Sequence, residues 1–171
     1  MKKILLISDT HSWLDPKILK YAADCDEVWH AGDVGNISVL EELQKIKPVR
    51  GVYGNIDSHE VRSEFEENLL FVVEGVRILM THIGGRPGKY PERVKYMIKL
   101  ECPKIFICGH SHIMAVIPDP VFKGLIYINP GAAGREGFHK MRTIVRMELD
   151  KGKIPKMEVL ELGARAKIEE I

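Results

Sequence analysis

The chain has 171 residues, which suffice for one well-buried domain and leave little room for a second. Its 45% hydrophobic and 29% charged residues are ordinary for a globular protein, and a formal net charge of +1 excludes the basic balance of a dedicated nucleic-acid-binding protein. No apolar stretch is long enough to cross a membrane. We therefore predict a single domain over residues 1–171 and no membrane segment.

The first part of the chain alternates short apolar runs with helical patterns. The runs, rich in Ile and Val, predict strands at residues 3–8, 27–30 and 49–53. One helical pattern starts near Pro16 and a second near Ser38. Some runs are apolar on both faces, as in a sheet that helices cover. The β-α-β-α-β order predicts a parallel layer with helical crossovers.

The middle of the chain predicts three further strands and one helix. The strands are expected at residues 70–73, 76–80 and 104–108, and the helix from Glu92 to about Leu100. Glu74-Gly75 separates the first two of these strands and is typical of a hairpin turn. Pro91 precedes the helix, as is common at a first helical turn.

The last third of the chain predicts strands without intervening helices. They are expected at residues 114–117, 125–128, 143–149 and 156–161. Asp150-Lys151-Gly152 is typical of a hairpin turn between the last two. This part is therefore predicted to be antiparallel and mostly β. An exposed edge of the last hairpin could pair with a second copy of the chain to form a homo-oligomer.

Polar residues that can bind a metal follow five of the apolar runs. The candidates are Asp9, His11, Asp33, Asn55, His82, His110 and His112. Because ligands bind beyond the carboxyl ends of strands in open α/β sheets, we expect these side chains to meet at one edge. Seven ligands are too many for one tetrahedral ion and suit two ions. Imidazole and carboxylate donors without thiolate favour Mn, Fe, Co, Ni or Zn over Ca.

The spacing of two pairs supports this interpretation. Asp9 and His11, like His110 and His112, are separated by one residue. On an extended backbone, residues i and i+2 point to the same side, so both members of a pair could reach one site. A glycine also directly precedes three of the seven candidates, where it would let the chain turn sharply off its strand.

The ordered motifs Asp-x-His, Gly-Asp, Gly-Asn-x-Asp, Thr-His and Gly-His-Ser-His resemble the calcineurin-like metallophosphoesterase superfamily. The short chain and the Asn129-Pro130-Gly131 sequence after a late strand resemble its small bacterial and archaeal phosphodiesterase branch. The motifs extend from Asp9 to Gly131, over most of the chain. The resemblance implies an α/β fold: a four-layer αββα sandwich of two mixed sheets, with the metals at one edge.

The resemblance also implies a role for each ligand. It assigns Asp9, His11 and His112 to one ion and Asn55, His82 and His110 to the other, with Asp33 as the bridge. The implied enzyme is a dinuclear metal-dependent phosphoesterase in which a hydroxide between two divalent ions attacks phosphorus in line. Mn and Ni are the favoured ions, and Asn55 would also act in catalysis by binding a phosphate oxygen.

One position departs from the pattern of many phosphomonoesterases in the superfamily. These often carry a histidine where this chain has Ile56, which cannot transfer a proton to a leaving group. The departure favours a small phosphodiester as substrate. Asp57 is assigned a catalytic role in orienting the loop or the ligands, and His59 is a weaker candidate for the missing acid. Arg86 could bind a phosphate oxygen, or could be a solvated loop residue.

Other residues remain open or are assigned to packing. His30 is predicted to be a core histidine and His139 a surface residue. Trp13 could line the site or fill a gap, and Arg135 could bind phosphate or solvent. The three cysteines are scattered and lack metal-type spacing, which favours reduced thiols and a cytoplasmic protein.

Two rival functions are compatible with the same motifs. The main one is a scaffold of this fold that has lost catalysis, as in the retromer subunit that resembles these enzymes. The other is a single-metal regulatory or storage protein. The expected partner of the enzyme is a small phosphodiester, with nucleic acid only as a possible substrate.

Overall fold

The computed structural model describes residues 1–166. The elements in chain order are β1 (Lys2–Ile7), α1 (Pro16–Ala23), β2 (Glu27–His30), α2 (Ser38–Gln44), β3 (Val49–Gly51), α3 (His59–Glu64), β4 (Asn68–Val73), β5 (Val76–Thr81), α4 (Glu92–Glu101), β6 (Ile105–Ile107), β7 (Ala115–Pro118), β8 (Ile126–Asn129), β9 (Met141–Asp150) and β10 (Lys153–Ala164). Every predicted strand and helix is present, most of them with shifted ends. Helix α3 was not predicted, because six residues with Val61 alone buried show no helical periodicity.

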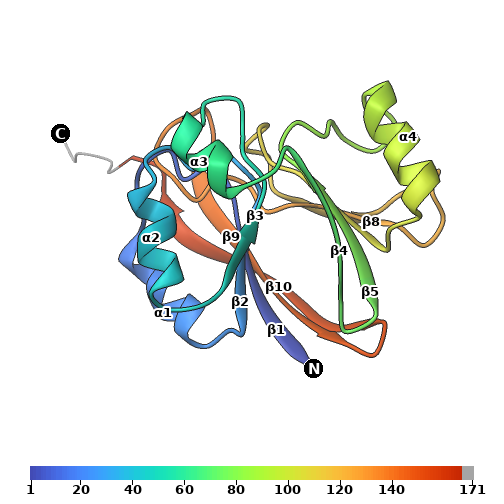
Figure 1. Ribbon diagram of the computed structural model, residues 1–171, viewed down its shortest axis with the longest axis horizontal. Helices are drawn as coiled ribbons and strands as arrows, with labels where there is room; N and C mark the ends of the chain where they lie inside the picture. The colour runs from blue at the N-terminus through green and yellow to red at the C-terminus, as the bar shows by residue number, and fades with distance from the viewer. Residues whose placement is uncertain (167–171) are drawn as a thin grey trace.

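The elements form four layers, as Figure 1 shows. The first sheet has the strand order β10-β9-β1-β2-β3, and the second sheet has the order β4-β5-β6-β8-β7. Apolar residues of α1, α2 and α3 pack on the outer face of the first sheet, and those of α4 on the outer face of the second. Both sheets mix parallel and antiparallel pairs. The predicted αββα sandwich is confirmed.

The pairing of strands confirms one topological prediction and corrects another. Strands β1, β2 and β3 are parallel, as predicted. In the C-terminal part the predicted antiparallel arrangement is confirmed for the pairs β7–β8 and β9–β10, but β8 also pairs in parallel with β6, and β9 joins the first sheet beside β1. A short apolar run indicates that a strand is buried on both faces, but it does not indicate which strand it pairs with. Strand β10 is an edge of the first sheet, so pairing with a second copy there stays a prediction.

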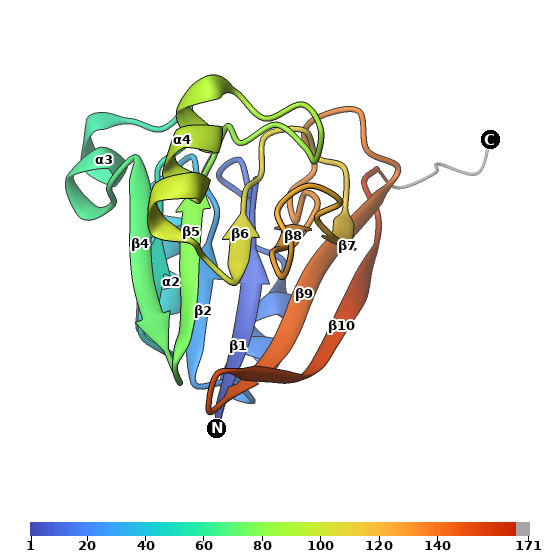
Figure 2. The same ribbon diagram turned by 90° about the vertical axis from the view of Figure 1, so that its right-hand side faces the viewer.

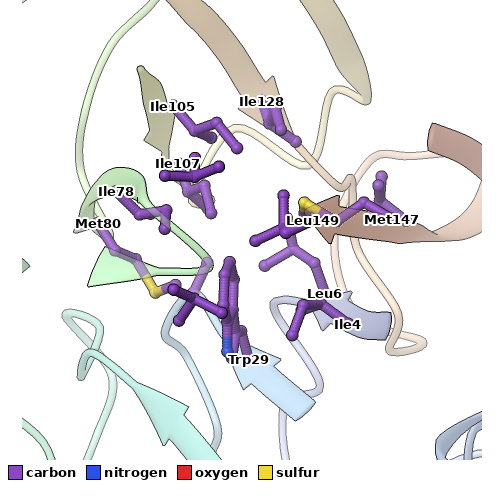
Figure 3. Packing of buried hydrophobic residues seen from close by; sticks show 14 of the residues in the cluster. Ile4, Leu6, Trp29, Ile78, Met80, Ile105, Ile107, Ile128, Met147 and Leu149 are labelled. Atoms are coloured by element: carbon purple, nitrogen blue, oxygen red, sulfur yellow. The ribbon is translucent and has the colours of Figure 1, made fainter. Parts of the chain in front are cut away.

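The main core lies between the two sheets (Figure 3). Ile4 and Leu6 of β1 point into it, while the alternate residues Leu5 and Ile7 pack toward α1 and α2. Trp29 is fully buried at the centre, where its ring meets Phe71 edge to face at 4.8 Å between centroids. Each such side chain contributes roughly 1.5–3 kcal/mol by its burial. This packing sets the distance between the loops of the two sheets.

Strands β1, β5 and β6 point toward the same end of the molecule, opposite the N-terminus (Figure 2). The end is shared by two sheets, whereas the sequence suggested the edge of one open sheet. Both predicted hairpin turns are present, with left-handed φ angles at Glu74 and Gly75 and at Lys151 and Gly152. Within residues 1–166, no helix is long and apolar enough to span a membrane.

Candidate metal centre

The loops at this end of the sandwich bring six of the seven predicted ligands into two groups. The first ligand group consists of Asp9, His11 and His112, and the second ligand group of Asp33, His82 and His110. Within each group, one candidate ligand atom per residue lies within 4.8 Å of the others. Each group combines residues from loops that belong to different sheets.

The two groups adjoin through their carboxylates. Asp33 Oδ2 lies 3.2 Å from His82 Nε2 and 3.5 Å from His11 Nε2, so it faces one histidine of each group. Asp9 Oδ1 lies 3.1 Å from His112 Nε2, and farther, at 3.8 Å, from His11 Nε2. Asp9 Oδ1 also lies 3.9 Å from His82 Nε2, so both carboxylates face the two groups, and Asp33 is the nearer of the two to His11 and His82.

The backbone of the two i, i+2 pairs is not extended. The prediction that an extended backbone points both members of a pair to one side was therefore wrong. Asp9, His11, His110 and His112 all have left-handed φ angles between 46° and 66°. A non-glycine residue in this region costs of order 1 kcal/mol or more, and such strain clusters at functional sites. The pairs converge because the chain coils tightly as it leaves the strand, and not because two side chains project from one face of it.

Glycines permit the close approach of these loops. A Cβ atom on Gly109 would collide with Ser8 Oγ and Asp9 Oδ2, and one on Gly54 would collide with the Asp33 carboxylate. Neither glycine has a positive φ, so both are needed for space and not for an unusual conformation. The backbone thereby packs directly against both carboxylates.

Asp9 is fully buried and held in one orientation. Its Oδ2 accepts hydrogen bonds from Ser8 Oγ at 2.6 Å and from the His110 backbone N–H at 3.2 Å, which leaves Oδ1 facing the histidines. Burial alone would raise the pKa of Asp9, but the imidazoles of His11 and His112 outweigh it and hold the pKa well below its ordinary value. Asp9 is therefore ionised at neutral pH.

Two of the ligand histidines have a buried ring nitrogen without a hydrogen-bond partner among the described residues. His82 Nδ1 lies 2.8 Å from the Ala31 carbonyl, which can only accept, so Nδ1 is protonated and the lone pair is on Nε2. Among the described residues, His11 Nε2 and His82 Nε2 are buried without a hydrogen-bond partner. An unpartnered buried nitrogen is costly, and an imidazole fixed through its other nitrogen is the form that binds a metal.

The site also favours a cation electrostatically. The Asp9 side chain raises the pKa of His11 above its ordinary value. Burial would lower the pKa of His82, but the neighbouring Asp33 and Asp9 carboxylates raise it. Two buried anions beside unpartnered imidazole nitrogens are the donor set of a transition-metal site. The residues present fit divalent metal ions.

The seventh predicted ligand, Asn55, lies beside the second ligand group. Its Oδ1 is 3.0 Å from His110 Nδ1. Asp57 is buried and its two carboxylate oxygens accept hydrogen bonds from Gly35 N at 2.8 Å and Gly54 N at 2.7 Å. Asp57 therefore ties the loop after β2 to the loop after β3, directly before Asn55.

The remaining candidates lie at different distances from the centre. Arg86 is exposed and lines a pocket that His110 also lines. His59 is the first residue of α3 and lies in a separate depression with Ser12 and Asn36. Arg86 therefore lines the same pocket as the proposed ligand His110, whereas His59 does not line that pocket.

His139 was predicted to be a surface residue, and this was wrong. It is half-buried and packs edge-on against His112, with 5.1 Å between ring centroids. Its Nε2 lies 2.9 Å from the Gly134 carbonyl, and its buried Nδ1 lacks a partner within the described residues. Glu136 of the same segment lies 3.7 Å from His11 Nδ1. In the sequence, only the glycines of this segment indicated that it could lie close to the metal centre.

His30 and Trp13 have structural contacts. His30 is fully buried, as predicted, between the Thr10 hydroxyl at 3.0 Å and the Gly32 N–H at 3.1 Å, and burial lowers its pKa to about 4. Trp13 lies under two guanidinium groups, those of Arg135 at 3.6 Å and Arg142 at 4.8 Å from its ring centre. Stacking on Trp13 therefore accounts for the position of Arg135.

Comparison with known proteins agrees with this geometry. A "Probable metallophosphoesterase" of Methanothermobacter thermautotrophicus is 27% identical over 132 residues, which is 74% of each chain. Two solved structures share the fold. The zinc complex of Vps29 from Entamoeba histolytica has a TM-score of 0.71, 16% identity, and coverage of 96% of this chain and 99% of its own. An archaeal phosphodiesterase has a TM-score of 0.67, 20% identity, and coverage of 92% and 99%.

The matching family model covers much more of the chain than the residues of the metal centre. Residues 1–152 match the model described as the calcineurin-like phosphoesterase superfamily domain. The match includes both ligand groups and all strands from β1 to β9. The family and the metallophosphoesterase relative support hydrolysis of phosphoric esters with divalent metal ions. The chain belongs to the calcineurin-like phosphoesterase superfamily.

Proposed function

We propose that this protein is a phosphodiesterase that works with two divalent transition-metal ions. The observation that carries the proposal is the pair of adjoining ligand groups, with Asp33 between a histidine of each. The proposed ligands are Asp9, His11 and His112 for one ion, Asn55, His82 and His110 for the other, and Asp33 for both. Among Mn, Ni, Fe, Co and Zn, all compatible with nitrogen and oxygen donors, Mn and Ni are favoured.

The chain's own residues hold this centre in a fixed geometry. Bound ions supply Lewis-acid activation of water and neutralise charge on phosphoryl oxygens. Ser8 and the His110 backbone N–H hold Asp9, while the Ala31 carbonyl holds His82. Such fixed supports avoid the cost of reorganising the ligands during reaction. The Asn55 amide could in addition donate its N–H to a phosphoryl oxygen.

The preference for a diester depends on the residue beside Asn55. Ile56 is exposed there, and its backbone N–H donates to Asp33 Oδ1 at 3.2 Å. Its side chain cannot protonate a departing alkoxide, and His59 lies in a separate depression. A substrate whose leaving group is already a weak base needs little protonation. An aryl or otherwise activated phosphodiester fits this requirement better than an alkyl monoester.

The proposal is tested with purified protein loaded with Mn²⁺ or Ni²⁺. We expect two metal ions per chain by elemental analysis, faster hydrolysis of bis(p-nitrophenyl) phosphate than of p-nitrophenyl phosphate, and loss of activity in chelator. Asp33→Asn should reduce kcat far more than Arg86→Ala, because Asp33 faces both ligand groups. Equal and small losses in the two variants would contradict the role of Asp33. One metal per chain would instead favour the single-metal protein.

A second candidate function is a binding scaffold of the same fold. The likeness to Vps29, a vacuolar protein sorting protein by name, favours it, as do the exposed Ile83 and Ile113 beside the centre. The complete ligand set argues for the enzyme. A folded sample with two metal ions that hydrolyses neither ester with any first-row divalent ion would favour the scaffold.

A further inference from the structure

An apolar pocket adjoins the second ligand group. It has a volume of about 590 Å³, within the range of small-molecule sites. His110 and Gly109 form the side nearest the ligands. The remaining wall includes Ile83, Ile113 and Ile117. A group attached to a phosphoryl at the second ligand group would therefore stand at the mouth of this pocket.

The pocket wall exposes apolar side chains that gain from being covered. Ile83 and Ile117 are each 41% exposed, and Ile113 is 67% exposed. Exposed isoleucines are ordinary singly, but three around one concavity mark a surface that binds an apolar group. The hydrophobic gain from covering them scales with the area removed from water.

The polar group of Tyr127, which lines the pocket, already has hydrogen-bond partners. Tyr127 is buried there, and its hydroxyl donates to the Gly85 carbonyl at 2.8 Å and lies 3.2 Å from Cys108 Sγ. The charged residues Arg86 and Lys89 are exposed on the same pocket. A bound group would therefore meet isoleucine side chains and a tyrosine whose hydroxyl already donates to Gly85, with two cations available to an anionic phosphoryl nearby.

The opposite side of the centre has a different chemistry. A second pocket of about 360 Å³ is lined by Asn55 and His82 together with Arg62 and Arg93. Ile83 lies in the walls of both pockets and separates them. The two sides thus select different substituents, a polar or charged one beside the arginines and an apolar one beside the isoleucines.

We propose that the apolar pocket binds an uncharged, planar apolar ester group of the substrate, such as an aryl group, while the phosphoryl lies at the ligand groups. This inference rests on the proposed function and narrows its substrate class to diesters with at least one such group. Ile117 of β7 is the specificity-determining residue to test, because it lines the pocket without being a proposed ligand and lies on an edge strand.

Binding of phosphonates tests the pocket without any turnover. Phenylphosphonate should bind the Mn²⁺-loaded protein about tenfold more tightly than methylphosphonate by titration calorimetry, a difference of about 1.4 kcal/mol. Ile117→Ser should remove most of this preference and leave methylphosphonate binding unchanged. Val72→Ser is the matched control, since Val72 is a β-branched residue, 56% exposed, on β4 at the other edge of the same sheet. Ile117→Thr keeps the β-branched shape should the serine variant not fold.

Kinetics separate this inference from the proposed function. On bis(p-nitrophenyl) phosphate, Ile117→Ser should raise KM severalfold with kcat nearly unchanged, as expected for loss of uniform binding. Equal affinities for the two phosphonates, or a phenyl preference that survives in Ile117→Ser and Ile117→Thr, would overturn the pocket even in an active enzyme. A phenyl preference that Ile117→Ser removes, in a protein that hydrolyses no ester, would keep the pocket and reject the hydrolase.

Discussion

Replacing Asp15 with alanine should destabilise the fold, because this carboxylate is buried and has two partners, the buried Arg142 and the backbone of Lys17. Its Oδ1 accepts a hydrogen bond from Lys17 N at 2.8 Å and caps α1, and its Oδ2 lies 2.6 Å from Arg142 Nη1. The Arg142 guanidinium also donates to the Leu162 and Ala164 carbonyls. The Asp15–Arg142 ion pair fixes the end of the loop that carries His11. Its loss should therefore also weaken metal binding by the first ligand group.

The expected cost can be estimated from these contacts. Loss of an N-cap costs about 1 kcal/mol. Removal of one partner from a buried ion pair costs roughly 3–5 kcal/mol, and the lower end applies here because Arg142 keeps two carbonyl acceptors. We therefore expect Asp15→Ala to lose about 4 kcal/mol. With an m value of about 2 kcal/mol/M, the urea midpoint would fall by about 2 M.

The assay is urea unfolding of metal-free protein, with a double-mutant cycle that includes Arg142→Met. The double variant should lose at least 1 kcal/mol less than the sum of the single variants, since each single change leaves a buried partner alone. Asp15→Asn retains a capping side chain and removes only the charge, so it should lose less than Asp15→Ala. Strict additivity, or a loss below about 1 kcal/mol in Asp15→Ala, would refute the reasoning.

The same pair predicts a pH dependence. Burial would raise the pKa of Asp15, but the hydrogen bonds from Arg142 and the Lys17 N–H and the positive charge of Arg142 together outweigh it and lower the pKa. A lowered folded-state pKa gives stability that is present above the unfolded value of about 4 and is lost as the pH falls through the folded value. The difference in unfolding free energy between the wild type and Asp15→Asn should therefore be full at pH 7 and shrink below about pH 4. An equal difference at both pH values would exclude the charge as its cause.

Three further predictions concern the metal centre. Because the pKa values of His11 and His82 are raised above 6.5, protons compete with metal, and metal uptake measured by calorimetry should weaken as the pH falls from 8 to 6; uptake independent of pH would contradict these ligands. Gly109→Ala should lower metal affinity at least tenfold in the same titration, because its Cβ would displace an Asp9 oxygen, and unchanged affinity would show that the loop can yield. His139→Ala should weaken metal binding about tenfold through the loss of packing on His112, whereas Phe138→Ala, at a fully exposed neighbour, should not; equal effects would remove His139 from the centre.

Local features of the sequence account for most of the elements. Apolar runs bounded by turn residues predicted every strand, and in β1 and β6 burial on both faces leaves a continuous run of apolar side chains. Glu74-Gly75 and Lys151-Gly152 predicted their turns because those positions require left-handed φ angles. Helix α3 was missed because its six residues carry too little periodicity to be distinguished from a loop.

Contacts between distant segments explain what was wrong. That β8 lies parallel to β6 depends on the packing of Ile126 and Ile128 against the first sheet, which no local pattern encodes. The position of His139 beside His112 arises where two loops far apart in the chain cross. The left-handed backbone of the ligand loops likewise depends on close contacts such as that of Gly109 with Asp9.

The sequence by itself determined which donor groups follow which strands, because a strand end and its next residues are local. It identified the candidate ligands and the isoleucine beside Asn55 that favours a diester. The family resemblance implied two ligand groups with Asp33 between them. Only the tertiary structure showed that the donors meet in two adjoining groups, and that an apolar pocket opens on one side and arginines on the other. The reason is that these loops come from two sheets, and the core around Trp29 sets the distance between those sheets.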